Sequence, residues 1–239
     1  MNRTAEAAIF YLTKNGVVWR DLPQGFPAWQ TVYWYFRKWA KDDTWLLIAN
    51  ERGRPRGDML HRIKANKKPL PTVAIIDSQS VKNSATATKQ TGFDGGKLIK
   101  GRKRFLIVDT MGHLLWTDVH PANVHDGQTG VVLWEQAEQL NPLLDDLVLL
   151  YADSTFGGHF KEQLETIYDM QVVIPKSPIK SQPTDSKLII HHWRWIVERT
   201  ISWLNNNRRL AKDYERTILS AQTYIWIVHT RRTLKRVWH

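Results

Sequence analysis

The chain has 239 residues, of which 42% are hydrophobic, enough for one sizeable domain with a packed core. It has no cysteine, which excludes a disulfide scaffold, a thiolate zinc site and a cysteine nucleophile. No apolar run is long enough to cross a bilayer, and the N-terminus lacks the features of a signal peptide. The net charge of +11 favours a polyanionic partner, either nucleic acid or an anionic membrane surface. Because Lys and Arg are spread along the whole chain, a long groove is favoured over a single anchoring helix.

Residues 1–50 are predicted to form a small helical region. Residues 3–14 carry apolar side chains at helical spacing, and Asn15-Gly16 is a typical helix stop. A second helix is expected over residues 29–45, with Trp29, Val32, Tyr33, Phe36, Trp39 and Ala40 on one face. Two helices with a basic outer surface are typical both of a DNA-binding unit and of a helical cap with a solvated face.

A basic linker is predicted over residues 51–70, which are rich in Arg, Lys, Gly and Pro, so residues 71–239 form a second domain. This domain is predicted to contain strands at 73–76, 104–110, 113–120, 147–151 and 171–175, and helices at 125–139, 160–168, 190–211 and 217–238. Residues 78–101 are polar and read as a loop. The order of these elements predicts an α/β fold, with a mixed sheet flanked by helices.

Three acidic residues form the candidate catalytic site. Asp77 and Asp153 each follow a short apolar strand, and parallel neighbouring strands would bring both to one edge of the sheet. Glu198 lies on a polar stripe of the helix at 190–211 and can lean toward the same edge. Each acid alone is typical of a turn, a cap or a surface, but together they suit two Mg²⁺ or Mn²⁺ ions about 3.5–4 Å apart. Such a site cuts a phosphodiester with water and joins strands with a DNA 3′-hydroxyl.

Several stretches resemble transposases of the IS5 group, within the IS4-like set of DDE transposases. They are PAWQTVYWYFR (27–37), DSQSVK (77–82), GFDGGK (92–97), KGRKRFLIVDTMG (100–112), AD (152–153), and WIVERTISWLN (195–205) leading into RRLAK (208–212). Each is weak alone, but together they are specific and cover nearly the whole chain.

The resemblance implies an RNase H-like catalytic core in which Asp77, Asp153 and Glu198 are metal ligands. It implies DNA cleavage and strand transfer at the terminal inverted repeats of an insertion sequence, with a target DNA as second substrate. It further implies a homodimer that pairs two DNA ends, acting in the cytoplasm of a prokaryote at the nucleoid, with no membrane partner.

The sequence departs from the family pattern in two ways. In the wider IS4-like set a Tyr, an Arg and a Lys flank the helical Glu at fixed spacing. Arg194 matches, whereas His191 and Asn205 stand in place of the Tyr and the Lys. Relatives also carry further residues before the first helix, so an N-terminally shortened copy is expected.

Basic residues indicate where DNA would lie, and they would position its backbone without reading its sequence. A dense basic series before the hairpin is predicted to be a phosphate-contacting loop, with a solvated charge run as the alternative. The candidate DNA-binding residues are Lys97, Lys100, Arg102, Lys103, Arg104, Arg194, Arg199, Arg208 and Arg209. The last helix ends in a basic series, Arg231, Arg232, Lys235 and Arg236, typical of a DNA contact or a solvated face.

Three functions follow from these patterns. The first is an active transposase. The second is a catalytically inactive remnant that binds DNA, or a repressor of a full-length transposase. The third is an RNase H-like nuclease that cleaves without joining strands. Metal-dependent nicking would separate the first and third from the second, and joined products would separate the first from the third.

Overall fold

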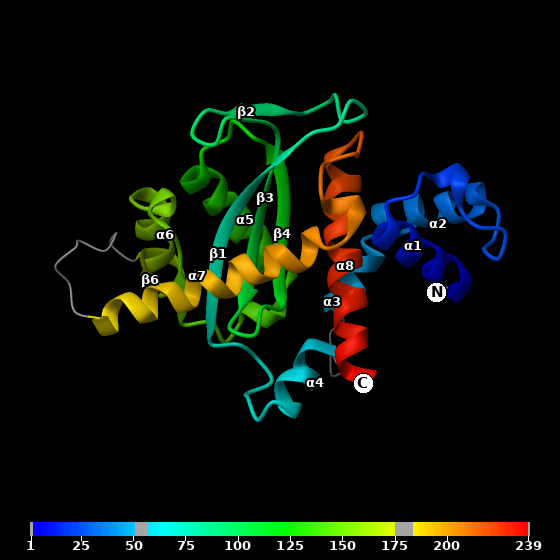
Figure 1. The fold of residues 1–239 in the computed structure, drawn as a ribbon. Coiled ribbons are helices and arrows are strands. Elements are labelled where there is room, and N and C mark those ends of the chain that lie inside the picture. Colours follow the sequence, from blue (N-terminus) through cyan, green and yellow to red (C-terminus); the bar gives the residue numbers. More distant parts are fainter. Residues whose placement is uncertain (1, 51–56, 175–183, 239) are drawn as a thin grey trace.

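A six-stranded mixed sheet forms the centre of the molecule, as the computed structural model of residues 2–50, 57–174 and 184–238 shows (Figure 1). Its strands are β1 (Val73–Lys82), β2 (Gly92–Asp94), β3 (Ile99–Asp109), β4 (Leu114–Pro121), β5 (Leu149–Tyr151) and β6 (Gln171–Val173). β1 pairs antiparallel with β3 and parallel with β5, which pairs parallel with β6. β2 and β4 both pair antiparallel with β3. The predicted mixed α/β sheet is confirmed.

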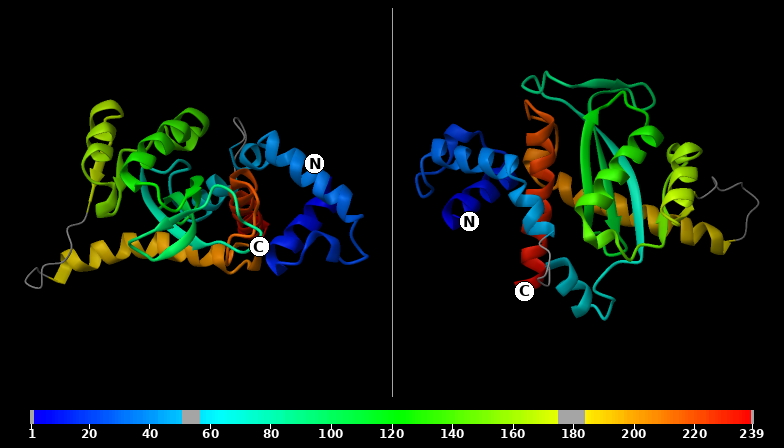
Figure 2. Two further views of the ribbon diagram at one scale, coloured as in Figure 1. Left: turned by 90° about the horizontal axis from the view of Figure 1, so that it is seen from above. Right: turned by 180° about the vertical axis from the view of Figure 1, so that it is seen from behind.

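Helices cover both faces of the sheet (Figure 2). α5 (Asp126–Leu140) and α6 (His159–Ile167) lie on one face, and α7 (Thr184–Asn205) crosses the other. α8 (Ile218–Trp238) packs beside β4, and four 3-10 turns complete the chain: η1 (Trp19–Asp21), η2 (Pro142–Leu144), η3 (Ser154–Phe156) and η4 (Arg208–Leu210). None of the helices in the described ranges has the length and apolar character needed to span a membrane.

The N-terminal helices pack against the side of α8 that faces away from the sheet (Figure 1). They are α1 (Arg3–Asn15), α2 (Trp29–Lys41) and α3 (Thr44–Asn50). The ring of Phe36 stacks on that of Tyr224, with centroids 4.9 Å apart. Through α8 the hydrophobic core therefore runs without a break from these helices to the sheet.

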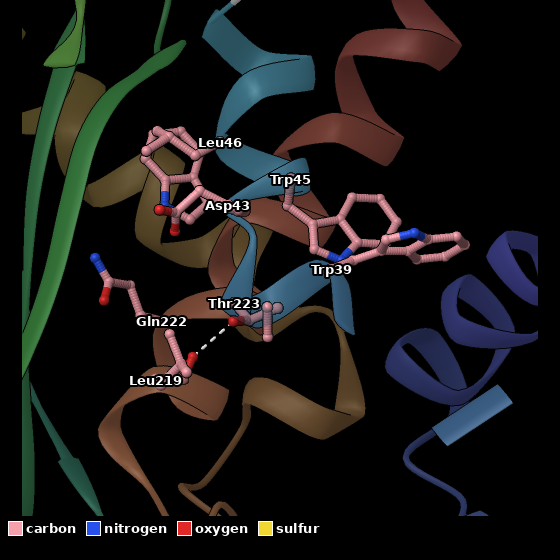
Figure 3. Close-up of a pocket in the computed structure, with 9 residues that line it drawn as sticks. Trp39, Asp43, Trp45, Leu46, Leu219, Gln222 and Thr223 are labelled. Atoms are coloured by element: carbon pink, nitrogen blue, oxygen red, sulfur yellow. Dashed lines mark hydrogen bonds between the residues drawn. The ribbon is translucent and has the colours of Figure 1, made fainter. Parts of the chain in front are cut away.

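The helix predicted over residues 29–45 is two helices. α2 ends at Lys41, and Asp43 adopts a positive φ of 52°, which turns the chain before α3 begins. The turn lets Trp45 reach the core, where its ring lies 5.7 Å from that of Trp39 and nearly perpendicular to it. Figure 3 shows these rings with Asp43 and with Gln222 and Thr223 of α8, which line the same small hollow.

The segment expected to be a linker contains a helix. Residues 51–56 lie outside the described part of the chain, but Gly57–Lys64 forms α4, which packs against the C-terminal half of α8. Composition favoured a solvated segment, yet Asp58 and Arg62 of this helix are buried. The division of the chain at residues 50 and 70 stays a prediction.

Ion pairs hold α4 in place. Asp58 lies 2.7 Å from Nδ1 of His113 and 2.8 Å from Nε2 of His229, so it joins the β3–β4 turn to α8. Arg62 forms a buried ion pair with Asp109 at the end of β3. Buried charges are tolerated where they are paired in this way, which explains why a polar segment forms a packed helix.

Two further boundaries differ from the prediction. β1 continues to Lys82 and β3 begins at Ile99, so much of the loop expected over residues 78–101 is strand. α7 begins at Thr184 and ends at Asn205, whereas residues 190–211 were expected to be helical. Residue 175, the predicted end of the last strand, is not among the described residues.

Candidate active site

The register of the sheet brings Asp77 and Asp153 together. The parallel pairing of β1 with β5 ends where Ile75 lies opposite Tyr151. Asp77 lies two residues after Ile75, and Asp153 lies two residues after Tyr151. Asp77 was expected just past a strand end, but it lies inside β1, opposite Leu106 of β3. Its other side is open because β5 has already ended there. Asp153 is the N-cap of η3, and its side chain accepts a hydrogen bond from the backbone N–H of Thr155 at 2.8 Å.

The electrostatics of Asp77 favour a cation. Burial and, to a smaller extent, the negative charge of Asp153 raise the pKa of Asp77, although the backbone N–H of Ser78, at 2.7 Å, and the positive charges of Lys97 and Arg194 lower it. The net result is a pKa of about 6. A cation beside Asp77 would stabilise its charged form.

The third predicted acid stands apart from this pair. The side chain of Glu198 on α7 is 57% exposed, and its Oε1 lies 3.0 Å from Nε of Arg194. In the described part of the chain, no group of three or more His, Asp or Glu side chains is arranged so that it could hold a metal ion. Trp193 stacks on Tyr151 with centroids 4.4 Å apart, which holds α7 over β5 near the aspartates. Glu198 is therefore linked to the pair through Arg194, whose charge acts on Asp77.

The predicted basic residues divide into those on the surface and those inside. Lys97 is exposed, and its Nζ donates to the carbonyl oxygen of Ser78, 3.3 Å away. Lys100 and Arg208 are also exposed. Arg209, by contrast, is half-buried and pairs with Glu215 at 2.7 Å. The residues next to the acids are thus Lys97 and Arg194.

The basic loop expected before the hairpin is instead largely strand β3, and Arg102, Lys103 and Arg104 have internal partners. Arg102 is fully buried and pairs with Asp213 at 2.9 Å. Arg104 is also buried and donates to the carbonyl oxygen of Leu210 at 2.9 Å, and burial lowers its pKa to about 10. The segment around η4 covers both guanidinium groups. They fix that segment to the sheet. Because both groups are buried, they cannot make the predicted contacts with DNA.

A buried network beneath the aspartates was not predicted. Oδ2 of Asp126 accepts hydrogen bonds from Ser78 Oγ at 2.9 Å and from Thr155 Oγ1 at 3.1 Å. Thr155 Oγ1 also contacts Asp153, and Lys103 Nζ lies 2.6 Å from Asp126 Oδ1. Asp126 therefore joins the residue after Asp77 to the loop of Asp153.

Asp126 is the first residue of α5, and its side chain faces the acidic site through Ser78 and Thr155. Because these partners come from distant segments of the chain, no local sequence pattern indicated this role. Of the two departures from the family pattern, Asn205 is the last residue of α7, and the side chain of His191 is not among those described.

Two protein-family models match this sequence. The sequence matches the family model "Transposase DDE domain" over residues 68–231 and the model "Putative transposase of IS4/5 family" over residues 1–49. A comparison with curated proteins gives no match.

Solved structures with some similarity include the catalytic core domain of BIV integrase, with 13% identity over 65% of this chain and 81% of that chain, at a TM-score of 0.40. The Mos1 transposase paired-end complex with left transposon end has 14% identity over 98% of this chain and 77% of that chain, at a TM-score of 0.32. The Mos1 strand transfer complex has 15% identity over the same shares, 98% and 77%, at a TM-score of 0.30.

The sheet with helices on both faces is the RNase H-like fold that the sequence predicts. The first family match covers more than half of the chain and contains both aspartates, Glu198 and the strands and helix that carry them. The chain therefore belongs to the DDE transposase family.

Proposed function

We propose that this transposase cleaves and joins DNA strands at the ends of an insertion sequence, with Asp77, Asp153 and Glu198 as ligands of two Mg²⁺ or Mn²⁺ ions. The observation that carries the proposal is the juxtaposition of Asp77 and Asp153 where β1 and β5 part. The raised pKa of Asp77 supports it, because a buried carboxylate beside a second one gains most from a divalent cation.

The donor set fits these metals. Carboxylate oxygens are hard ligands that Mg²⁺ and Mn²⁺ prefer, and the chain offers no cysteine to select a softer ion. When bound, the ions would activate the attacking oxygen and stabilise the leaving oxygen of the phosphodiester.

Glu198 is free to act as the third ligand. Its partner Arg194 is 72% exposed, and an ion pair between two exposed side chains contributes only about 0–1 kcal/mol. Glu198 can therefore exchange the guanidinium for a metal ion at small cost. The same exchange would release Arg194 to bind a phosphate oxygen of the DNA.

The residues around the acids have separate roles in this proposal. Lys97 and Arg194 bring positive charge to Asp77, and they would orient the scissile phosphate by binding its free oxygens. Asp126 holds Ser78 and Thr155, and so fixes the backbone on either side of the site. The net charge of +11 supports DNA as the partner, and we propose a homodimer that pairs two ends in the cytoplasm.

The test is a cleavage assay on a plasmid that carries the element's ends, with and without Mg²⁺ or Mn²⁺. We expect metal-dependent cleavage and joined products from the wild-type chain and none from Asp153→Asn. A matched control is Asp146→Asn, which removes an exposed carboxylate outside the site and should leave cleavage unchanged. Normal cleavage by Asp153→Asn would refute the site. Cleavage without joined products would indicate a nuclease, and DNA binding without cleavage an inactive remnant.

A further inference from the structure

A stripe of tryptophan and arginine side chains runs along α7 and onto α8. Trp195, Arg199 and Trp203 recur every four residues and so share one face of α7. The guanidinium carbon of Arg199 lies 4.3 Å from the ring centroid of Trp195 and 4.5 Å from that of Trp203. Arg232 and Arg236 of α8 also face the ring of Trp203. We call these five residues the tryptophan–arginine stripe.

The stripe holds three positive charges without a paired carboxylate. Among the residues that the structure describes, Arg199, Arg232 and Arg236 form no ion pair with an acid, in contrast to Arg62, Arg102 and Arg209. Two of the three donate to carbonyl oxygens of the β3–β4 turn, those of Met111 and Gly112. One buried nitrogen atom of each arginine has no hydrogen-bond partner, namely Arg199 Nε, Arg232 Nη2 and Arg236 Nη1, so contacts within the described part of the chain do not satisfy the cluster.

Such a cluster is balanced by an anion. Burial, with the charges of Arg236 and Arg199, lowers the pKa of Arg232 to about 8, although the charges of Asp58 and Asp109 act in the opposite direction. The three arginines keep part of their surface open to solvent, so an anion can approach them. A guanidinium stacked on an indole ring uses its flat face and leaves the N–H groups of its edge for in-plane hydrogen bonds, the geometry that a phosphate requires.

The stripe lies on another part of the fold than the acidic site. It is fixed to the β3–β4 turn at Met111 and Gly112, whereas Asp77 pairs with Leu106, inside β3. Arg199 follows Glu198 directly, and about 100° of helix turn separates adjacent residues on α7. A DNA strand bound at the acids would therefore continue past the stripe within a short distance.

We propose that the tryptophan–arginine stripe binds backbone phosphates of DNA beside the cleavage site and so positions the duplex without reading its sequence. This inference rests on the proposed function, because it takes the bound polyanion to be the DNA that the acids cut. The stripe adds Arg232 and Arg236 to the predicted contact at Arg199.

The test measures binding of a fluorescent duplex in EDTA, by anisotropy, over a range of salt concentrations. The variants are Arg199→Gln and Arg236→Gln, and Arg232 is left intact because it is the most buried of the three. Lys235→Gln is the matched control, since it removes an exposed charge from the neighbouring position of α8. Melting curves establish that each variant is folded.

We expect each stripe variant to bind about three- to tenfold more weakly, with the salt slope reduced by about one phosphate, while Lys235→Gln keeps the wild-type slope. Wild-type affinity and slope in both folded stripe variants would overturn the inference. The inference would also be overturned if the stripe binds free phosphate instead of DNA. In that case inorganic phosphate would raise the melting temperature of the wild type, and the variants would bind DNA as the wild type does.

The inference and the proposed function fail separately. Binding in EDTA does not need metal, so Asp77→Asn should bind the duplex as the wild type does. If that variant still cleaves DNA while the stripe variants bind weakly, the acidic site is refuted and the stripe stands. If cleavage is lost in Asp77→Asn but the stripe variants bind normally, the stripe is refuted and the acidic site stands.

Discussion

Replacing Asp77 with Asn should abolish cleavage and at the same time stabilise the metal-free fold. Burial raises the pKa of Asp77 from 3.8 to about 6, so the folded chain holds this proton more tightly than the unfolded chain. The protonated carboxyl group of Asp77 therefore stabilises the fold fully below pH 3.8, and this stabilisation is lost as the pH rises through about 6. At neutral pH the charged carboxylate therefore costs stability, and the neutral amide removes that cost.

The size of the effect follows from the shift. A change from 3.8 to about 6 corresponds to about 3 kcal/mol, at 1.36 kcal/mol for each pKa unit. Because the carboxyl group keeps some contact with solvent, screening reduces the expected gain to about 1–2 kcal/mol. For a chain of this length, each kcal/mol raises the melting temperature by about 2–4 °C.

Thermal unfolding in EDTA checks this reasoning. At pH 7.5 the Asp77→Asn variant should melt several degrees above the wild type, and the difference should shrink as the pH is lowered toward 4. Adding Mg²⁺ should raise the melting temperature of the wild type more than that of the variant, because the bound ion relieves the same repulsion. Asp146→Asn serves as the control and should show neither effect. A variant that melts below the wild type at pH 7.5 would refute the argument.

Three further substitutions test the surrounding structure. Asp126→Asn should cost about 3 kcal/mol in urea unfolding, because it leaves the buried ammonium of Lys103 with only the carboxylate of Asp94, 4.0 Å away, and an unchanged midpoint would contradict this. Gly101→Ala should cost about 1–3 kcal/mol in a thermal melt, because the new Cβ would lie 2.0 Å from the carbonyl oxygen of Val81 in β1. Burial opposes the charge on Asp58, but its two histidine partners hold its pKa well below 3.8. The charged carboxylate therefore stabilises the fold above pH 3.8, and this stabilisation is lost as the pH falls below that value. Asp58→Asn should therefore unfold at lower urea than the wild type at pH 7, and the two should converge below pH 4.

The order of helices and strands could be predicted because local patterns determine it. Residues 3–14 repeat apolar side chains at helical spacing, and Gly16 ends α1 with a positive φ of 70°. The turn between the two strands predicted at 104–110 and 113–120 lies at Gly112, whose φ of 77° favours glycine. The two aspartates could be predicted for the same reason, since both directly follow or interrupt short apolar runs.

The second half of β1 could not be predicted, because its burial depends on partners far along the chain. Ser78 and Ser80 are buried, although hydroxyl groups at alternating positions are typical of a solvated segment. Ser78 donates to Asp126 on α5, and Ser80 to Asp94 beyond the next turn. A polar side chain can be buried once such an acceptor exists, and no local pattern shows that it does.

Local sequence patterns also do not show which positively charged side chains lie on the surface of the fold. The net charge of +11 indicated a polyanionic partner, but it does not say which cations face that partner. Arg62 and Arg102 neutralise buried aspartates inside the fold, whereas Lys97 and Arg208 lie on the surface. Because each phosphate contact releases counterions, the salt slope of DNA binding counts the cations that touch DNA. That slope should therefore be smaller than the net charge suggests, and removing a surface cation that contacts DNA, such as Lys97, should lower it by about one contact.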